Sequence, residues 1–225
     1  MNLYNLIDWL RPIRCRERNS ITKNAYGNCL EYGSGREPYR NVLRNRVEHY
    51  VSCDWSEESK SVKTSTGREM KALSGQFDSI VCTDVIQHIS NPSACLDELY
   101  DLLKPGGVLC LSSVFFFPVC DLKDYWRFSK EGMVELCQRS GFHIQNVDQR
   151  AGALCTTLLV LQHFFQRAFG GPYTGWRSKR GFMRRLMVLV IELLFMIPAW
   201  VAYFLDKIIP SYDLTIGYVV VAKKC

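Results

Sequence analysis

Two glycines stand in the segment Glu31–Gly35, between a short apolar run and a helix-like stretch. Glycine has no Cβ, so a bulky anionic or zwitterionic cofactor can approach the backbone closely at such a turn. The free N–H groups and the dipole of a following helix favour a charged ligand at the same place. The pattern alone is weak, because many turns use glycine. It makes Glu31, Gly33, Ser34 and Gly35 the first candidates for cofactor contacts.

An acidic residue, Asp54, ends the next apolar run. It lies at about the twenty-residue spacing at which nucleotide-binding folds place an acid that accepts hydrogen bonds from ribose hydroxyls. The alternative role is a turn residue or the N-cap of a helix beginning at Trp55. The two roles are compatible, because both place the carboxylate in the same crevice.

A histidine and a polar loop provide candidates for catalysis and acceptor binding. The imidazole of histidine titrates near neutral pH, so His88 is the first candidate for a general base, with Asp124 and Tyr125 as the next. The alternative is a structural histidine bonded to a loop carbonyl. Arg127 could hold a phosphate or carboxylate by a forked contact, or form a salt bridge to Asp124 or Glu131 instead. Tyr125 and Trp126 are expected either to stack on a sugar or to pack as anchors.

These residues lie at the ends of alternating strand-like and helix-like segments, which is typical of βαβ units around a parallel sheet. Strands are predicted at 28–32, 47–53, 77–83, 108–113, 142–147 and 216–223, and helices at 3–10, 38–45, 93–103 and 129–140. Residues 56–74 are expected to hold a helix, a short strand and a loop. Pro12 and Asn19-Ser20 predict breaks in a basic N-terminal stretch, and Lys104-Pro105-Gly106-Gly107 predicts a sharp turn.

The run from Phe77 to Pro92 and the run Leu102–Leu109 resemble the class I S-adenosylmethionine-dependent methyltransferases of the type 11-like branch. The resemblance covers roughly residues 27 to 150 and the last strand. It implies an α/β enzyme with a Rossmann-like seven-stranded sheet flanked by helices. It also implies S-adenosylmethionine as the cofactor, with Asp84 joining Glu31, Gly33, Ser34, Gly35 and Asp54 as its expected contacts.

The segment Asp124–Gly132 resembles methyltransferases linked with cell-surface polysaccharide and glycolipid assembly. That resemblance implies O-methylation of a glycan or a lipid-linked cell-envelope intermediate. The sequence departs from the family at Glu37, where a third glycine is usual, and at Gln87, where glutamate is usual; Glu69 is the nearest counterpart of the acid that contacts adenine. A membrane-associated binding protein on a degenerate methyltransferase fold is therefore an alternative. A nicotinamide-dependent oxidoreductase is disfavoured, because Pro38 replaces the third glycine of its fingerprint.

Composition and charge limit the partners. The net charge of +6 would allow an anionic surface, a phosphorylated acceptor or nucleic acid, although we expect no nucleic acid. Ten cysteines without a C-x-x-C pair, and only four histidines, provide no metal-site spacing, so we expect no metal. We expect a cytosolic protein with reduced cysteines, because residues 1–10 lack the pattern of a signal peptide.

The apolar region 153–209 is expected to be a helical insertion that divides the chain into an extension (1–26), the insertion, and a Rossmann-like domain (27–152 and 210–225). Residues 186–205 are long enough to span a bilayer, and a basic cluster (Arg177, Lys179, Arg180, Arg184, Arg185) precedes them. A single crossing would separate the last strand from its sheet, and Glu192 and Pro198 interrupt the run. We therefore expect peripheral attachment to the cytoplasmic face of a membrane. A cap buried on the domain, or a homodimer through the insertion, is the alternative.

Overall fold

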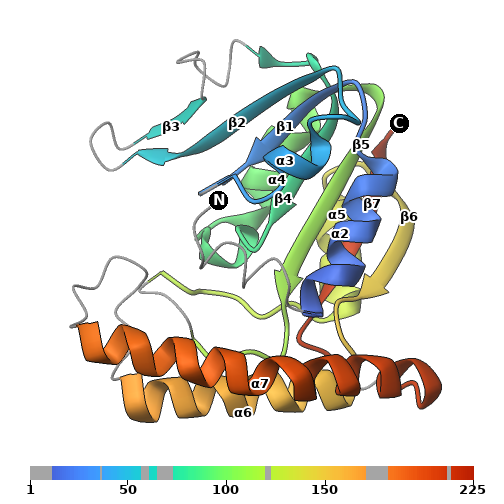
Figure 1. Cartoon of the computed structure of the whole chain (residues 1–225). Helices are drawn as coiled ribbons and strands as arrows, with labels where there is room; N and C mark the ends of the chain where they lie inside the picture. Colours follow the sequence, from blue (N-terminus) through green and yellow to red (C-terminus); the bar gives the residue numbers. More distant parts are fainter. Residues whose placement is uncertain are drawn as a thin grey trace.

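The computed structural model of the chain describes residues 12–35, 37–56, 61–64, 73–119, 123–170, 182–211 and 214–225. A seven-stranded sheet has the order β3-β2-β1-β4-β5-β7-β6 (Figure 1). Its strands are β1 (Asn28–Tyr32), β2 (His49–Ser56), β3 (Ser61–Thr64), β4 (Phe77–Thr83), β5 (Leu103–Val114), β6 (Phe142–Gln149) and β7 (Gly217–Lys224). The helices are α2 (Ile13–Asn24), α3 (Arg40–Leu43), α4 (Pro92–Leu102), α5 (Lys130–Arg139), α6 (Ala153–Gly170) and α7 (Phe182–Ile208), with a short 3-10 helix η2 (Ile86–His88).

Strand directions place the ends of the central strands at one edge. β1 is parallel to β2 and β4, and β4 is parallel to β5, whereas β7 is antiparallel to both β5 and β6. The runs Cys29–Tyr32 and Ser79–Cys82 are buried throughout, as expected of strands covered on both faces. The Rossmann-like seven-stranded sheet with a helical insertion before its last strand is thereby confirmed.

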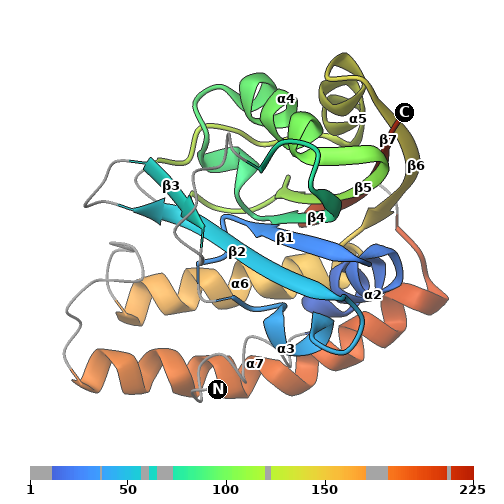
Figure 2. The same ribbon diagram turned by 90° about the horizontal axis from the view of Figure 1, so that it is seen from above.

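Helices cover both faces of the sheet (Figure 2). One apolar core packs α4 and α5 on one face through Leu96, Leu99 and Met133. A second core packs α2 and α3 on the other face through Ile21 and Leu43. The sheet is therefore packed between two helical layers, with the larger apolar core on one face and the smaller core on the other, as in other α/β domains.

Helix ends follow local chemistry. Asn91 caps α4 by accepting the N–H of Ala94, with Pro92 in the first turn, where its missing N–H is harmless. Ser129 caps α5 by accepting the N–H of Gly132. Gly141 follows α5 with a φ of 89°, the left-handed conformation that favours glycine after a helix.

Three sequence expectations about local structure are wrong. A continuous helix, α2, runs from Ile13 through Asn19-Ser20, because Pro12 precedes its first turn, where proline does not interrupt hydrogen bonding. The turn predicted at Lys104 lies inside β5, which begins at Leu103 directly after α4, and the pairing shifts between Phe77 and Ser79.

The third error concerns β3. It pairs antiparallel to β2, with Cys53 opposite Thr64, whereas the sequence pattern predicts parallel βαβ units.

The helix predicted at 38–45 is one turn at Arg40–Leu43. The helix predicted at 3–10 and the acid Glu69 lie outside the described residues.

The insertion consists of two helices that pack side by side, α6 and α7. In Figure 1 strands β5 and β6 run toward this pair, which lies below the edge where they end. A third apolar cluster joins the pair to the domain through Ala151, Cys155, Leu159, Ala202 and Ile216. β7 follows α7 and pairs with β5 over its whole length, so the chain returns to the sheet after the insertion.

Candidate functional site

The turn after β1 has the open backbone expected of a cofactor-binding loop. Gly33 and Gly35 have φ values of 69° and 51°. A Cβ at Gly33 would come within 2.4 Å of Val85, so only glycine fits there. A Cβ at Gly35 would meet no atom of the described residues within 4 Å. The N–H of Ser34 donates to the carbonyl of Cys53 at 2.9 Å and thereby holds the turn against β2.

Glu31 lies at the end of β1 with 1% of its surface exposed. The hydroxyl of Tyr50 donates to its Oε2, whereas Oε1 is buried and has no hydrogen-bond partner among the residues that the structure describes. Burial raises the pKa of Glu31 to about 7, against the opposing effects of the Tyr50 hydrogen bond and of the Tyr39 backbone N–H. A buried carboxylate oxygen without a partner at the cofactor loop fits a site that is completed by a hydrogen-bond donor on the ligand.

Two acids, Glu37 and Asp54, lie near the cofactor-binding loop. Glu37 has a φ of 53° and accepts from Ser52 Oγ at 2.5 Å and from Arg40 at 2.6 Å. These hydrogen bonds lower the pKa of Glu37 and hold its carboxylate between β2 and α3. Asp54 is exposed and lies within β2, which continues to Ser56, so it does not end its strand. The role of Asp54 as a ribose contact stays a prediction.

Asp84 follows β4 and belongs to a cluster of four charged side chains. Arg150 donates to both of its oxygens, and Arg14 donates to Oδ2 at 2.9 Å. Glu17, which is fully buried, accepts from Arg14 at 2.9 Å and from Arg150 at 3.2 Å. Burial works to raise the pKa of Asp84, but Arg150 and Arg14 hold it well below its ordinary range. In this arrangement Asp84 binds two guanidinium groups at the edge where the cofactor is expected.

Sequence reasoning missed Arg14, Glu17 and Arg150. The available signal was the spacing of Arg14 and Glu17, one helical turn apart in a segment interpreted as a broken basic stretch. Arg150 carries no local signal, since it follows β6 and meets Glu17 only through the fold.

His88 ends η2 beside β5. Its Nδ1 lies 2.6 Å from the carbonyl of Lys123, which requires a proton on Nδ1. Its Nε2 lies 3.3 Å from the side-chain nitrogen of Gln87, so Nε2 is the acceptor of that longer contact. Gln87 Oε1 in turn accepts from Ser113 Oγ at 3.0 Å. The loop-carbonyl contact expected of a structural histidine is thus present, and Nε2 is the nitrogen that can accept a proton.

The loop between β5 and α5 is held by Arg127. Its Nε and Nη2 donate to the carbonyls of Phe117 and Pro118 at 3.0 and 3.2 Å. Its Nη1 donates to the Trp126 carbonyl at 2.8 Å, and both Nη atoms donate to Asp124. A guanidinium has five N–H donors, and these contacts engage all five. The salt-bridge alternative for Arg127 is therefore the one observed, and Asp124 is its partner.

The remaining loop residues lie at the surface. Tyr125 and Trp126 are exposed, and their contacts run toward η2. The N–H of Tyr125 donates to the Gln87 carbonyl at 2.9 Å, and Trp126 Nε1 donates to the Ile89 carbonyl at 2.9 Å. The structure therefore brings His88, Asp124, Tyr125, Trp126 and the chain at Gln87 together beside the ends of β4 and β5.

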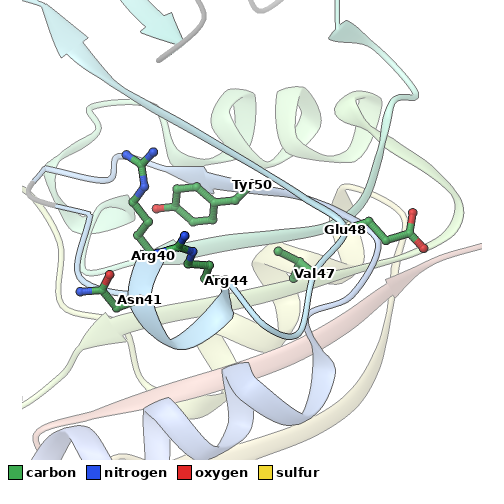
Figure 3. A pocket seen from close by; sticks show the side chains of 6 residues that line it. All are labelled: Arg40, Asn41, Arg44, Val47, Glu48 and Tyr50. Carbon is green, nitrogen blue, oxygen red and sulfur yellow. The ribbon is translucent and has the colours of Figure 1, made fainter.

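A cavity of about 410 Å³ opens elsewhere, beside α3 and the start of β2 (Figure 3). It is lined by Arg40, Asn41, Arg44, Val47, Glu48 and Tyr50. None of these residues belongs to the expected cofactor set, and ligands of open α/β sheets bind beyond the carboxyl ends of the strands. We therefore place the candidate site at the Gly33–Gly35 turn rather than in this cavity. Among the described residues, no group of three or more His, Cys, Asp or Glu side chains is arranged as metal ligands.

Comparison with known proteins gives a consistent picture. Residues 9–152 match a family described as "Methyltransferase domain". A ubiquinone biosynthesis O-methyltransferase of Psychrobacter cryohalolentis is 42% identical over 40 residues, which are 18% of this chain and 16% of that protein. The matched part is therefore a small fraction of the curated relative.

Solved structures match over most of the chain at low identity. The cyclase SpnF superposes with a TM-score of 0.56 at 14% identity, over 93% of this chain and 80% of SpnF. A Thermotoga maritima S-adenosylmethionine-dependent methyltransferase, titled a possible histamine N-methyltransferase, has a TM-score of 0.53 at 14% identity, over 99% of this chain and 92% of that chain. At such identities the likeness establishes the fold alone.

Proposed function

Because the chain belongs to the methyltransferase domain family, whose methyl donor is S-adenosylmethionine, we propose that it methylates a hydroxyl group of a glycan or lipid-linked cell-envelope intermediate. The observation that carries the proposal is the Gly33–Gly35 turn beside Glu31, whose buried Oε1 has no hydrogen-bond partner in the described part of the chain. The match to an O-methyltransferase of ubiquinone biosynthesis supports an oxygen acceptor.

The residues at the turn fit the cofactor. Gly33 and Gly35 would allow it to approach the backbone, and Glu31 would accept a hydrogen bond from it. Asp54 remains our candidate for its ribose and Asp84 for its amino-acid end, and Ser34 remains a further candidate contact. When bound, S-adenosylmethionine supplies an electrophilic methyl group, whose bond electrons stay with the sulfur when the group is displaced. The chain's own task is then to align the acceptor oxygen and to exclude water.

Proton removal is assigned to His88. As the acceptor oxygen forms its bond to carbon, its proton passes to Nε2, which carries no proton in the tautomer that the Lys123 and Gln87 contacts imply. The 3.3 Å contact from Gln87 to Nε2 is long, so an acceptor hydroxyl can replace it. Tyr125 and Trp126 would contact the acceptor, while Arg127 and Asp124 would keep the loop in place for it.

Calorimetry with S-adenosylmethionine tests cofactor binding. We expect Gly35→Val to abolish binding, because the added side chain enters the space beside the turn. Gly75→Val is the matched control: Gly75 has a φ of 64°, its Cβ would likewise meet no atom of the described residues within 4 Å, and it precedes β4 at the opposite edge of the sheet. Both variants carry the same backbone strain, about 1–3 kcal/mol. Equal cofactor affinity in the two variants would contradict the assignment.

Turnover tests His88. His88→Ala is expected to lower the turnover number about a hundredfold while leaving cofactor affinity unchanged. Turnover is measured by methyl transfer from labelled S-adenosylmethionine into a cell-envelope extract. A variant that retains full turnover would return His88 to the structural role indicated by its Lys123 contact.

The alternative of a binding protein on a degenerate methyltransferase fold rests on Gln87 and Glu37. Calorimetry gives the first test of the two hypotheses, because an intact enzyme should bind S-adenosylmethionine, and the labelled-transfer assay gives the second. Binding without transfer to any envelope fraction would favour the alternative.

We also propose that the enzyme works at the cytoplasmic face of a membrane, to which it attaches peripherally through the α6–α7 pair. Among the described residues, one helical segment, Leu186–Ile208, is long and apolar enough to cross a membrane, with a mean hydropathy of 2.3. β7 follows this helix in the chain and pairs with β5, so a helix that crossed the membrane would separate β7 from its sheet. We therefore favour attachment along the membrane surface. We expect the whole chain to sediment with membranes, and a chain with residues 182–207 replaced by a Gly/Ser linker to remain in the supernatant.

A further inference from the structure

We propose that the α6–α7 pair and the loop after β5 form one docking surface for an anionic lipid bilayer, and that the acceptor reaches His88 from that bilayer. The proposal deepens the proposed function, on which it rests, by committing to a membrane-resident amphiphile as the acceptor. It joins two groups of residues that lie far apart in the sequence.

The polarity of α7 is inverted relative to a helix of a water-soluble domain. Its acids point inward: Glu192 and Asp206 are 3% and 2% exposed. Its large aliphatic residues point outward, with Ile197 and Ile208 each 75% exposed and Leu194 68% exposed. Further exposed apolar residues continue this face at helical spacing: Leu186, Met187, Val190, Leu193, Val201, Phe204 and Leu205. A helix facing water has the opposite arrangement, so this face is suited to a hydrocarbon environment.

The buried acids hold the helix in this orientation. Asp206 accepts the N–H groups of Leu154 and Cys155, at 3.0 and 2.9 Å, and so caps the first turn of α6. Glu192 accepts from Gln166 of α6 at 3.2 Å. If α7 rotated to bury its aliphatic face, Asp206 would move away from the N–H groups of Leu154 and Cys155. These groups would then lose their hydrogen-bond acceptor, which is costly. The apolar face is therefore a stable feature of the fold.

Charge favours a bilayer over a second copy of the chain as the occupant. Lys207 stands in the last turn of α7, and the sequence has Arg184 and Arg185 just before the apolar run at 186–205. A second copy of the chain carries the same positive charges and offers no free acid on α7 to neutralise them, since Asp206 is buried and accepts from α6. Anionic headgroups neutralise both ends at once. Arg177, Lys179 and Arg180 add to this charge in the sequence, although they lie outside the described residues.

Two contacts join α6 to the loop after β5, which leads to the candidate active site. The Phe117 ring packs against His163 of α6 with centroids 5.2 Å apart and the rings tilted by 51°, and Arg167 donates to the Val119 carbonyl. The loop after β5 exposes Phe116 and Val119 next to these contacts, and it exposes Tyr125 and Trp126 beside His88.

Aromatic side chains with a polar edge are characteristic of the membrane interface. An acceptor with a lipid tail can therefore keep its tail in the bilayer while its hydroxyl group reaches His88.

Vesicle co-sedimentation of the whole chain tests the surface. We expect binding to phosphatidylcholine vesicles that contain phosphatidylglycerol, and at least tenfold weaker binding to vesicles of phosphatidylcholine alone. Ile197→Glu is expected to weaken binding at least tenfold. Tyr26→Glu is the control, since Tyr26 is also an exposed large side chain but precedes β1 at the far edge of the sheet. A lipid-free dimer that binds no vesicles, or equal binding by the two variants, would overturn the proposal.

Fluorescence tests whether the loop shares the surface. Brominated phosphatidylcholine quenches only tryptophans that reach the acyl region. We expect the quenched amplitude to fall in Trp126→Phe, because Trp126 lies on the docking loop. If vesicles bind but Trp126→Phe leaves the quenched amplitude unchanged, the site faces the cytosol and the acceptor arrives from solution. Neither readout uses S-adenosylmethionine, so failure here is distinct from failure of calorimetry, which would instead remove the proposed function.

Discussion

At the residue scale, the site contains side chains that could do chemistry but are engaged in holding the backbone. Arg127 directs its N–H groups to Asp124 and to three loop carbonyls. Such an arginine would have to break contacts inside the loop before it could bind an anion. Glu31 is different, because one of its oxygens is buried without a hydrogen-bond partner among the described residues. The residue with an unmet hydrogen-bonding requirement is therefore the better candidate for ligand contact.

Glu31 gives a prediction about pH. Its pKa in the fold is about 7, against an ordinary value of 4.5, so between these values the folded chain binds a proton that the unfolded chain has lost. The free energy of unfolding therefore falls as pH rises through this window, by about 3 kcal/mol at most. Glu31→Gln is expected to remove this fall and to stabilise the chain above pH 7. Urea unfolding across the pH range measures it.

The matched control for Glu31 is Glu135→Gln, since Glu135 lies exposed on α5 and pairs with Arg139 at the surface. Its pH profile should follow that of the unmodified chain. A Glu31→Gln profile that also follows it would show that the carboxyl does not titrate in this window.

At the scale of elements, the sequence predicted those with strong apolar runs and missed those defined by partners. The bounds of β1 and β4 agree with the apolar runs at 28–32 and 77–83. α2 was not predicted, because its buried face includes Glu17, which pairs with arginines from elsewhere in the fold. A short strand was predicted within residues 56–74, and β3 lies there, but no alternation in this polar region indicates its antiparallel pairing with β2.

The candidate site shows the same division. The glycine turn and the proximity of His88 to the 124–127 loop could be predicted, since both follow from chain order and from strands ending at one edge. The Asp84 cluster could not, because it unites α2, β4 and the end of β6, three elements far apart in the sequence.

The cap between α7 and α6 gives the second prediction. Asp206→Ala removes the acceptor of two N–H groups at the start of α6, so it is expected to cost about 1–3 kcal/mol of stability. Hydrogen exchange at the amides of Leu154 and Cys155 should accelerate in the same variant. Asp97→Ala, at an exposed position on α4, is the control and should leave both quantities within about 0.5 kcal/mol of the unmodified chain. Unchanged exchange in Asp206→Ala would show that α6 does not depend on this cap.

At the scale of the whole molecule, the buried charges connect the N-terminal helix to the centre and to one edge of the sheet. Arg150 follows β6, Asp84 follows β4, and Arg14 and Glu17 belong to α2. Ser112 of β5 also donates to Glu17. The cluster lies at the edge of the sheet where the cofactor is expected. A change that breaks its ion pairs is therefore expected to alter the shape of the cofactor site.

Removal of Arg150 tests this connection. Arg150→Met keeps the volume of the side chain but leaves Glu17 without one of its two guanidinium partners and Asp84 without its bidentate one. Breaking a buried pair by removing one partner costs about 3–5 kcal/mol, since the remaining charge is buried without compensation. We expect that loss in urea unfolding. We also expect faster hydrogen exchange in α2, because Arg150 joins that helix to the end of β6 through Glu17.

The control is Arg139→Met, which breaks an exposed pair with Glu135 and should cost less than about 1 kcal/mol. A double variant, Arg150→Met with Glu17→Gln, should recover part of the lost stability, because it also removes one of the uncompensated charges. If the double variant is instead as unstable as the sum of its single changes, Arg150 and Glu17 act independently, and the cluster does not bind α2 to the sheet as a unit.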